Sequence, residues 1–169
     1  MRNLDRDLSS YVFVDLGAGK GRTVLLAAGQ PFSRVLGVEF AGELVTIARQ
    51  NLQSYRSKTQ KCRRMKVIHA DAAEFKLPNE PLVLYFYNPF GPEVFGQVLE
   101  NLADSLTRHP RDCFMIYASS YADTLDWVRP LVLTNGQFKE IATKPMPLFF
   151  DAVRSVHFAI FARASYSEP

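Results

Sequence analysis

Cysteine and histidine are scarce in this sequence. Its 169 residues include two cysteines, Cys62 and Cys113, and three histidines, His69, His109 and His157. The cysteines share no paired spacing, so nothing indicates a disulfide framework or a zinc knuckle. The histidines are scattered, and no Ser-His-Asp set or carboxylate pair indicates hydrolytic chemistry. We interpret them as structural, with His69 the nearest to the candidate site, and expect no metal and a reduced, cytoplasmic setting.

Long apolar runs are also absent. No hydrophobic segment approaches the roughly 20 residues that span a bilayer, and the first ten residues are polar and charged, unlike a signal peptide. We therefore expect a soluble protein that does not enter a membrane. The formal net charge is only +3, and charge alone does not indicate a nucleic-acid partner.

The chain does show a regular alternation of strand-like and helix-like segments. Its length and its hydrophobic content of 47% suit one domain, which we place at residues 11–169 after an N-terminal flank of residues 1–10. Residues rich in Val, Ile, Leu and aromatics predict strands at Tyr11–Asp15, Val35–Phe40, Lys66–Ala70, Leu82–Tyr87, Cys113–Ala118, Phe138–Thr143 and Val156–Ala162. Apolar spacing of three and four predicts helices at Lys20–Gly29, Gly42–Ser57, Glu93–Arg108 and Tyr121–Val128.

This alternation predicts an α/β fold of the Rossmann-like, doubly wound class, with a seven-stranded, mostly parallel sheet and helices on both faces. The last two strands should form an antiparallel C-terminal hairpin, because the segment between them contains Pro145 and Pro147 and no helical pattern. Ligands of such sheets bind beyond the carboxyl ends of the strands, at the switch in strand order. The loops that follow the strands are therefore the candidate functional sites.

The first of these loops contains three alternating glycines, Gly17, Gly19 and Gly21, after a strand that ends in Asp15. Glycine tolerates positive φ and has no Cβ, so backbone N–H groups can face a polar or anionic small molecule at the start of a helix. The loop therefore predicts a nucleotide-like cofactor. A phosphate-binding P-loop is rejected, because it needs four residues between its first glycine and Gly-Lys-Ser/Thr, whereas here Gly19-Lys20-Gly21 follows Gly17 too closely. The dinucleotide fingerprint Gly-x-Gly-x-x-Gly also differs, which leaves an NAD-type site as the second interpretation.

The next three predicted strands also end in residues that suit an adenosine-like ligand. Glu39 lies 20 residues beyond Gly19, the separation at which a carboxylate accepts hydrogen bonds from a ribose diol. Asp71 and Ala72 follow the third strand, and Asn88-Pro89-Phe90 follows the fourth. Taken singly, Glu39 could end a strand at the surface and Asp71 could cap a helix. Their joint placement favours a binding site.

These segments together resemble class I S-adenosylmethionine-dependent methyltransferases over nearly the whole chain. The resemblance rests on Val14-Asp15-Leu16-Gly17-Ala18-Gly19-Lys20-Gly21-Arg22, Gly37-Val38-Glu39, Asp71-Ala72 and Asn88-Pro89-Phe90. It implies S-adenosylmethionine as the cofactor, with its methionine moiety held by Asp15 and by the backbone of Leu16, Gly17, Ala18 and Gly19. By the same resemblance, Glu39 binds the ribose, Phe40 lies against the adenine, Asp71 and Ala72 meet the adenine edge, and Asn88 stands near the amino group and the reacting methyl.

The segment Asn88-Pro89-Phe90 is also similar to the Asn-Pro-Pro-Tyr/Phe motif of amino-group methyltransferases, with one proline missing. The glycine loop and Glu39 resemble those of non-SET protein-lysine methyltransferases. These resemblances imply in-line methyl transfer to an amine or amide nitrogen of an unidentified acceptor, with Asn88, Pro89 and Phe90 as the catalytic residues. A turn leading into the next helix is the alternative interpretation of this segment. The alternative functions are an NAD-type oxidoreductase and a non-catalytic, cofactor-binding scaffold.

Three further features of the sequence carry expectations. Tyr121, Phe149, Phe150 and Asp151 are candidates for lining the acceptor pocket, with core packing as the alternative. The basic cluster precedes the third strand, at the edge of the sheet opposite the cofactor, so a solvated face is favoured over a docking patch; it comprises Arg56, Lys58, Lys61, Arg63, Arg64 and Lys66. Only residues 1–10 precede the first strand, where the family usually carries helices. We therefore expect an open cofactor site, or one covered by a partner chain or by oligomerisation.

Overall fold

A computed structural model describes residues 7–121, 123–134, 136–148 and 151–163. The strands are β1 (Val12–Leu16), β2 (Arg34–Glu39), β3 (Met65–His69), β4 (Leu82–Tyr87), β5 (Cys113–Ser119), β6 (Phe138–Leu148) and β7 (Asp151–Arg163). The helices are a short 3-10 helix η1 (Leu8–Ser10), α1 (Arg22–Ala27), α2 (Gly42–Ser54), α3 (Pro92–Arg108) and α4 (Thr124–Leu133). None of the helices in these described ranges is long and apolar enough to cross a membrane.

The strands form one seven-stranded sheet in the order β3-β2-β1-β4-β5-β7-β6. The pairs from β3 to β5 are parallel, and β7 is antiparallel to both β5 and β6. The chain builds outward from β1 to β3 and then returns to place β4 on the other side of β1. The switch in strand order therefore lies between β1 and β4, where this class of sheet binds ligands. The predicted fold is confirmed.

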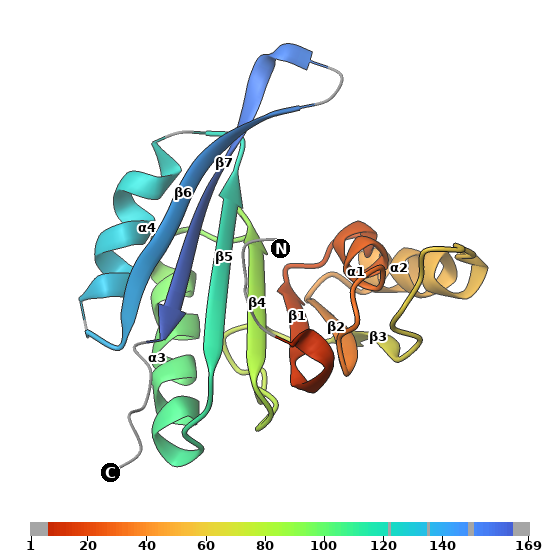
Figure 1. Ribbon diagram of the computed structural model, residues 1–169, viewed down its shortest axis with the longest axis horizontal. Coiled ribbons are helices and arrows are strands. Elements are labelled where there is room, and N and C mark those ends of the chain that lie inside the picture. Colours follow the sequence, from red (N-terminus) through yellow and green to blue (C-terminus); the bar gives the residue numbers. More distant parts are fainter. Residues whose placement is uncertain (1–6, 122, 135, 149–150, 164–169) are drawn as a thin grey trace.

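Helices cover both faces of the sheet (Figure 1). Figure 1 shows α3 and α4 beside the half formed by β4 to β7, and α1 and α2 beside the half formed by β1 to β3. Val12, Val14 and Leu16 of β1 belong to the core cluster that also contains the buried side of α3 and α4. Phe13 belongs to the cluster on the α1 side, and alternation along the strand places Asp15 on that side as well. Asp15 is therefore an acidic residue in a strand that is buried on both faces.

The C-terminal hairpin is longer than predicted. Pro145 pairs with His157 and Pro147 with Ser155, so β6 continues beyond the expected end at Thr143. Proline lacks the N–H of a ladder hydrogen bond, and an edge strand tolerates it because one side of that strand has no partner. Since β6 is an edge strand, the two prolines do not end it.

Helix α4 also differs from its prediction, since it begins at Thr124 rather than at Tyr121 and ends at Leu133 rather than at Val128. The Ser119 hydroxyl accepts a hydrogen bond from the Tyr121 N–H at 3.0 Å and donates one to the Thr124 hydroxyl at 2.9 Å, which holds a turn before the helix. Pro130 lies inside α4 without ending it.

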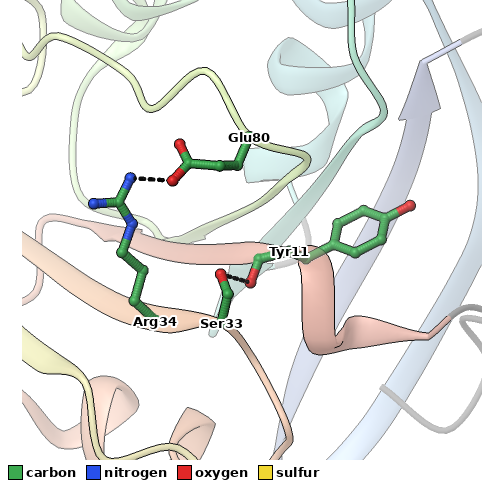
Figure 2. Close-up of polar contacts among 4 residues, drawn as sticks. All are labelled: Tyr11, Ser33, Arg34 and Glu80. Carbon is green, nitrogen blue, oxygen red and sulfur yellow. Dashed lines mark hydrogen bonds and ion pairs between the residues drawn. The ribbon is translucent and has the colours of Figure 1, made fainter.

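Polar contacts join the chain at the end of the sheet where the parallel strands begin, away from the switch-point loops. The Ser33 hydroxyl donates to the Tyr11 carbonyl at 2.8 Å, and the Arg34 guanidinium lies 2.6 Å from the Glu80 carboxylate (Figure 2). These bonds join the starts of β1 and β2 to the segment before β4. Both members of the ion pair are solvent-exposed, so we expect it to contribute less than about 1 kcal/mol.

Candidate functional site

The glycine loop connects β1 to α1 and lies against the end of β2. Gly17, Gly19 and Gly21 all have positive φ, of 85°, 53° and 79°. The Gly17 and Ala18 N–H groups both donate to the Val38 carbonyl at 2.9 Å. The left-handed glycines therefore let the chain turn sharply while it stays bonded to the neighbouring strand.

The three glycines face different surroundings. A Cβ on Gly17 would lie 2.4 Å from the Cβ of Pro89, and one on Gly21 would lie 3.2 Å from the Cβ of Ala48. A Cβ on Gly19 would meet nothing within 4 Å. Close packing against the protein thus requires glycine at position 17, whereas Gly19 is the glycine whose backbone borders open space.

Glu39 bridges the glycine loop and the start of α2. One of its carboxylate oxygens accepts the Gly19 N–H at 2.8 Å and the other accepts the Ala41 N–H at 2.9 Å. Each carboxylate oxygen can accept a second hydrogen bond. Glu39 is therefore held in place by backbone donors while both of its oxygens keep the capacity to bind a diol.

Asp15 is buried beneath this loop, with 2% of its surface exposed. Burial raises the pKa of Asp15 to about 7; a hydrogen bond from the Thr23 side chain opposes this shift, and the charge of Glu39 adds to it. Tyr85 pairs with Asp15 across the β1–β4 ladder, and burial together with the Asp15 charge raises the pKa of Tyr85 as well. Asp15 thus titrates near neutral pH, which is typical of functional carboxylates but also occurs in structural ones.

A cavity of about 350 Å³ opens at the switch in strand order, within the size range of small-molecule sites. We call it the first cavity. It gathers seven of the residues predicted from the sequence, from four separate loops: Gly17, Glu39, Phe40, Asp71, Ala72, Pro89 and Phe90. Phe40 is 72% exposed, and the His69 ring nitrogen Nε2 lies 2.8 Å from its carbonyl oxygen. The exposed ring is therefore available to a planar ligand at this edge.

Five predicted residues do not line the first cavity. Asp15, Leu16 and Ala18 are buried beneath it, and Gly19 and Asn88 lie outside its lining. Sequence reasoning missed Val38, Ala70 and Val94, which do line it. A signal for Val94 was present in the sequence, because it is an apolar residue in the first turn of the helix after the fourth strand.

Asp71 does not cap a helix. Its carboxylate accepts the Ala73 N–H at 2.9 Å in a turn, and no helix forms between β3 and β4 in the part of the chain that the structure describes. The alternative interpretation of Asp71 as a helix cap is therefore wrong. Both residues line the first cavity, where Asp71 is exposed to solvent and Ala72 is buried.

Asn88 occupies a strained position after β4. Its φ of 43° lies in the left-handed region, the only such value among the described non-glycine residues. Its N–H donates to the Ala118 carbonyl at 2.9 Å, and its side-chain oxygen Oδ1 accepts from the Tyr117 hydroxyl at 3.4 Å. The raised pKa of Tyr117, about 12 because of burial, keeps that hydroxyl protonated as a donor. The hydroxyl of Tyr117 in β5 thus orients the side chain of Asn88.

A second cavity of about 530 Å³ lies on the other side of this turn. Asn88, Pro89 and Phe90 line it from the turn after β4, Tyr121 lines it from the turn after β5, and Trp127 lines it from α4. Pro89 and Phe90 also line the first cavity, so the two cavities share a wall. Of the other acceptor-pocket candidates, Phe149 and Phe150 lie outside the described residues, as does the side chain of Asp151.

The remaining histidines do not join the two cavities. His109 caps the end of α3, and His157 pairs with Ser119 in the β5–β7 ladder. In the described ranges, no three His, Cys, Asp or Glu side chains gather as a metal site would require.

Comparisons with known proteins agree with this geometry. The methyltransferase domain family matches residues 13–109, which is more than half of the chain. No curated protein sequence matches. Similar solved structures include magnesium protoporphyrin IX methyltransferase from Synechocystis PCC 6803 with bound S-adenosylmethionine (15% identity, TM-score 0.65, 90% of this chain and 69% of that one). Precorrin-6y C5,15-methyltransferase from Geobacter metallireducens is also similar (20% identity, TM-score 0.62, 96% and 83%).

A third similar structure is TrmK from M. capricolum in complex with S-adenosylhomocysteine (12% identity, TM-score 0.64, 94% of this chain and 64% of that one). At these identities the solved structures establish the shared fold, and the family match establishes the relationship. The glycine loop, the acids at successive strand ends and the family match lead to the same assignment: the chain belongs to the methyltransferase domain family, and it shares the fold of class I S-adenosylmethionine-dependent methyltransferases.

Proposed function

We propose that the chain transfers the methyl group of S-adenosylmethionine to an amine or amide nitrogen, with the cofactor in the first cavity and the acceptor in the second. The observation that supports this most is the wall that the two cavities share at Pro89 and Phe90. A donor in one cavity and an acceptor in the other would both contact this short turn. Direct transfer then requires that the reacting atoms meet past its rim, about 3 to 3.5 Å apart.

The hydrogen bonds and exposure of the residues in and beside the first cavity fit the groups of S-adenosylmethionine. Glu39 is fixed by two backbone donors and keeps one acceptor position on each oxygen, which matches the two hydroxyls of a ribose. Gly19, which lies outside the lining, borders open space, and Phe40 of the lining presents an exposed ring. We assign Glu39 to the ribose, Phe40 with Asp71 and Ala72 to the adenine, and Asp15 with the loop from Leu16 to Gly19 to the methionine end.

S-Adenosylmethionine supplies an electrophilic methyl group on a sulfonium. Asn88 would accept a hydrogen bond from the acceptor nitrogen, so that the nitrogen lone pair is directed at the methyl. Its Oδ1 already accepts from the Tyr117 hydroxyl, and the second acceptor position remains for the substrate. The aromatic rings of Phe90, Tyr121 and Trp127 would exclude water and pack on the acceptor. Alignment and desolvation need no dedicated general base.

Cofactor binding can be tested by calorimetry with S-adenosylmethionine, S-adenosylhomocysteine and NAD. The Glu39→Gln variant keeps the size of the side chain but replaces one acceptor oxygen with a donor, so it should bind both adenosyl compounds on the order of tenfold more weakly or worse. Glu43→Gln, which makes the same charge change at an exposed position in the first turn of α2, should bind like the wild type. Tight binding of NAD in preference to the adenosyl compounds would overturn the assignment.

The acceptor can be tested by transfer of a labelled methyl group from the cofactor into cell-extract fractions, followed by analysis of the methylated atom. Asn88→Gly removes the amide, and glycine adopts the positive φ of this position without strain. We expect this variant to bind the cofactor normally and to lose most of the labelling, while Gln97→Ala on the exposed side of α3 labels normally. Methylation of an oxygen or a carbon, or equal labelling by Asn88→Gly, would contradict the nitrogen assignment.

We also propose that the protein works in the cytoplasm. Both of its cysteines are free and buried, which suits a reducing compartment.

A further inference from the structure

The positive charge of this chain is concentrated in one segment. Residues 44–70 contain no Asp or Glu, and they contain seven of the 20 cationic residues: Arg49, Arg56, Lys58, Lys61, Arg63, Arg64 and Lys66. The remaining 13 cations share the rest of the chain with all 17 acids, so that part carries a net charge of −4. The overall value of +3 therefore conceals a strongly basic segment on an otherwise acidic protein.

The structure gathers this segment around a groove. The end of α2, the following loop and the start of β3 enclose a volume of about 650 Å³. Its lining includes the cations Arg56, Lys58 and Arg63, and also Tyr55 and Met65. We call this volume the basic groove. It lies in the half of the sheet that Figure 1 shows farthest from the hairpin β6–β7.

The loop that carries these cations is anchored at both ends. Where α2 ends, the Tyr55 N–H donates to the Asn51 carbonyl at 3.0 Å, and three further bonds hold the end before β3. The Lys61 and Cys62 N–H groups donate to the Ala28 carbonyl at 2.8 and 2.9 Å, and the Arg64 carbonyl accepts from Val35 at 2.9 Å. Cys62 is buried, with 3% of its surface exposed. The backbone of the groove is therefore fixed before any ligand arrives, which lowers the ordering cost of binding.

No ion pair within the described residues involves the cations of the segment. The ion pairs of those residues join Arg34 to Glu80 and Arg129 to Glu140. The Arg56 guanidinium donates to the carbonyls of Gln53 and Tyr55 at 2.7 and 2.8 Å. These neutral acceptors orient the guanidinium without neutralising it.

We propose that the basic groove binds the phosphate backbone of a single-stranded nucleic acid. Lys and Arg side chains bind phosphates, and an aromatic side chain in a basic groove is what single-strand binders use to stack bases. Tyr55 supplies such a side chain here. A concave site with an aromatic ring suits a nucleic-acid strand better than a flat anionic membrane or an acidic peptide.

This docking surface is separate from the methyl-transfer site. Met65 of the groove and His69 beside the first cavity are the two ends of β3, about 13 Å apart at the rise of a strand. Helix α2 likewise runs from the cavity edge at Gly42 to the groove at Ser54, about 18 Å at the rise of a helix. A nucleic acid in the groove would therefore leave the first cavity free, and the proposal does not depend on which atom is methylated.

The test measures binding of a fluorescent, mixed-sequence RNA of about 12 nucleotides, a length within the range that single-strand sites cover. Anisotropy is followed across salt concentrations from about 50 to 200 mM, where phosphate contacts lose affinity steeply. The groove variant combines Arg56→Gln, Lys58→Gln and Arg63→Gln, the three cations that line the groove. Loss of three phosphate contacts should make the slope of log affinity against log salt less negative by about 2.

The matched control combines Lys76→Gln, Arg108→Gln and Lys139→Gln, three exposed cations outside the segment. Both variants lose three positive charges, so a difference between them reports position rather than net charge. Calorimetry with S-adenosylhomocysteine should give wild-type values for both variants, which shows that each is folded. Preference for RNA over a DNA strand of the same sequence would identify RNA as the ligand, and equal affinities would identify the shared phosphate backbone.

Three results would overturn the proposal. The first is equal weakening of RNA binding by the groove and control variants. The second is binding of polyglutamate or of anionic phospholipid vesicles as tightly as of the oligonucleotide. The third is no RNA binding by the wild-type protein at about 50 mM salt, the low end of the range in which such contacts are strong.

Discussion

Replacing Asp15 with asparagine should change how the stability of the cofactor-free protein depends on pH. Asp15 is 2% exposed, and burial raises its pKa from 3.8 to about 7. Because the folded pKa lies above the unfolded one, the folded chain holds a proton that the unfolded chain releases between about pH 4 and pH 7. Stability contributed by this proton is present below pH 4 and is lost as the pH rises through 7.

The magnitude follows from the size of the shift. Each unit of pKa difference corresponds to about 1.4 kcal/mol, so a shift from 3.8 to about 7 costs on the order of 4 kcal/mol once Asp15 is ionised in the folded state. This is a large part of the stability of a typical domain. Asparagine carries no charge and can still accept the hydrogen bond from Thr23, so Asp15→Asn avoids the cost.

Urea unfolding of the wild type and of Asp15→Asn, followed at several pH values from 4 to 8.5, measures this effect. The difference in free energy of unfolding should grow in favour of the variant as the pH rises to about 7 and then stay constant. Groups other than Asp15 titrate in both proteins and cancel in the difference. Glu43→Gln, at an exposed position, should show no such growth. A difference for Asp15→Asn that is constant with pH would refute the reasoning, because it would mean that Asp15 has an ordinary pKa.

Three further predictions follow from the same region and from the core. Affinity for S-adenosylmethionine should fall about tenfold from pH 7 to pH 5.5 in the wild type, because the cationic methionine end requires ionised Asp15, whereas Asp15→Asn should bind weakly with little change in calorimetry. Gly17→Ala should destabilise the fold by about 3 kcal/mol through the clash with Pro89 and the positive φ, and Gly19→Ala by only about 1 kcal/mol through φ; equal losses in urea unfolding would contradict the close packing. Phe95→Ala should cost about 3–5 kcal/mol in the same assay, and a loss below about 1 kcal/mol would mean that its ring is not a central core contact.

The inner strands β1, β4 and β5 could be predicted because most of their residues are buried. All five residues of β1 are buried, and a parallel strand in such a position reads as a continuous apolar run. The ends of elements were less predictable. Tyr11, expected in the first strand, instead follows the 3-10 helix and donates its N–H to the Leu8 carbonyl. The lengths of the hairpin strands depended on whether proline fell at the edge of the sheet, which only the strand order decides.

The candidate site was predictable as a set of strand ends but not as a set of contacts. Glu39 and Asp71 could be placed together because carboxyl ends of parallel strands meet at one edge of the sheet. The packing of Gly17 against Pro89 could not be predicted, since it joins loops far apart in the sequence. The same is true of the Tyr117 hydroxyl on Asn88. The basic cluster was recognised, but its spacing alone could not show that it encloses a groove.

The prolines of β6 have a consequence for how these molecules behave in concentrated solution. An unpaired strand at the edge of a sheet offers a row of N–H and C=O groups to which another chain can add, and this is a route to aggregation. Positions 145 and 147 lie on the same side of the strand, and neither has an N–H to donate. A ladder with a neighbouring molecule would therefore be interrupted at these two positions, which makes this part of the edge a poor template for intermolecular sheet growth.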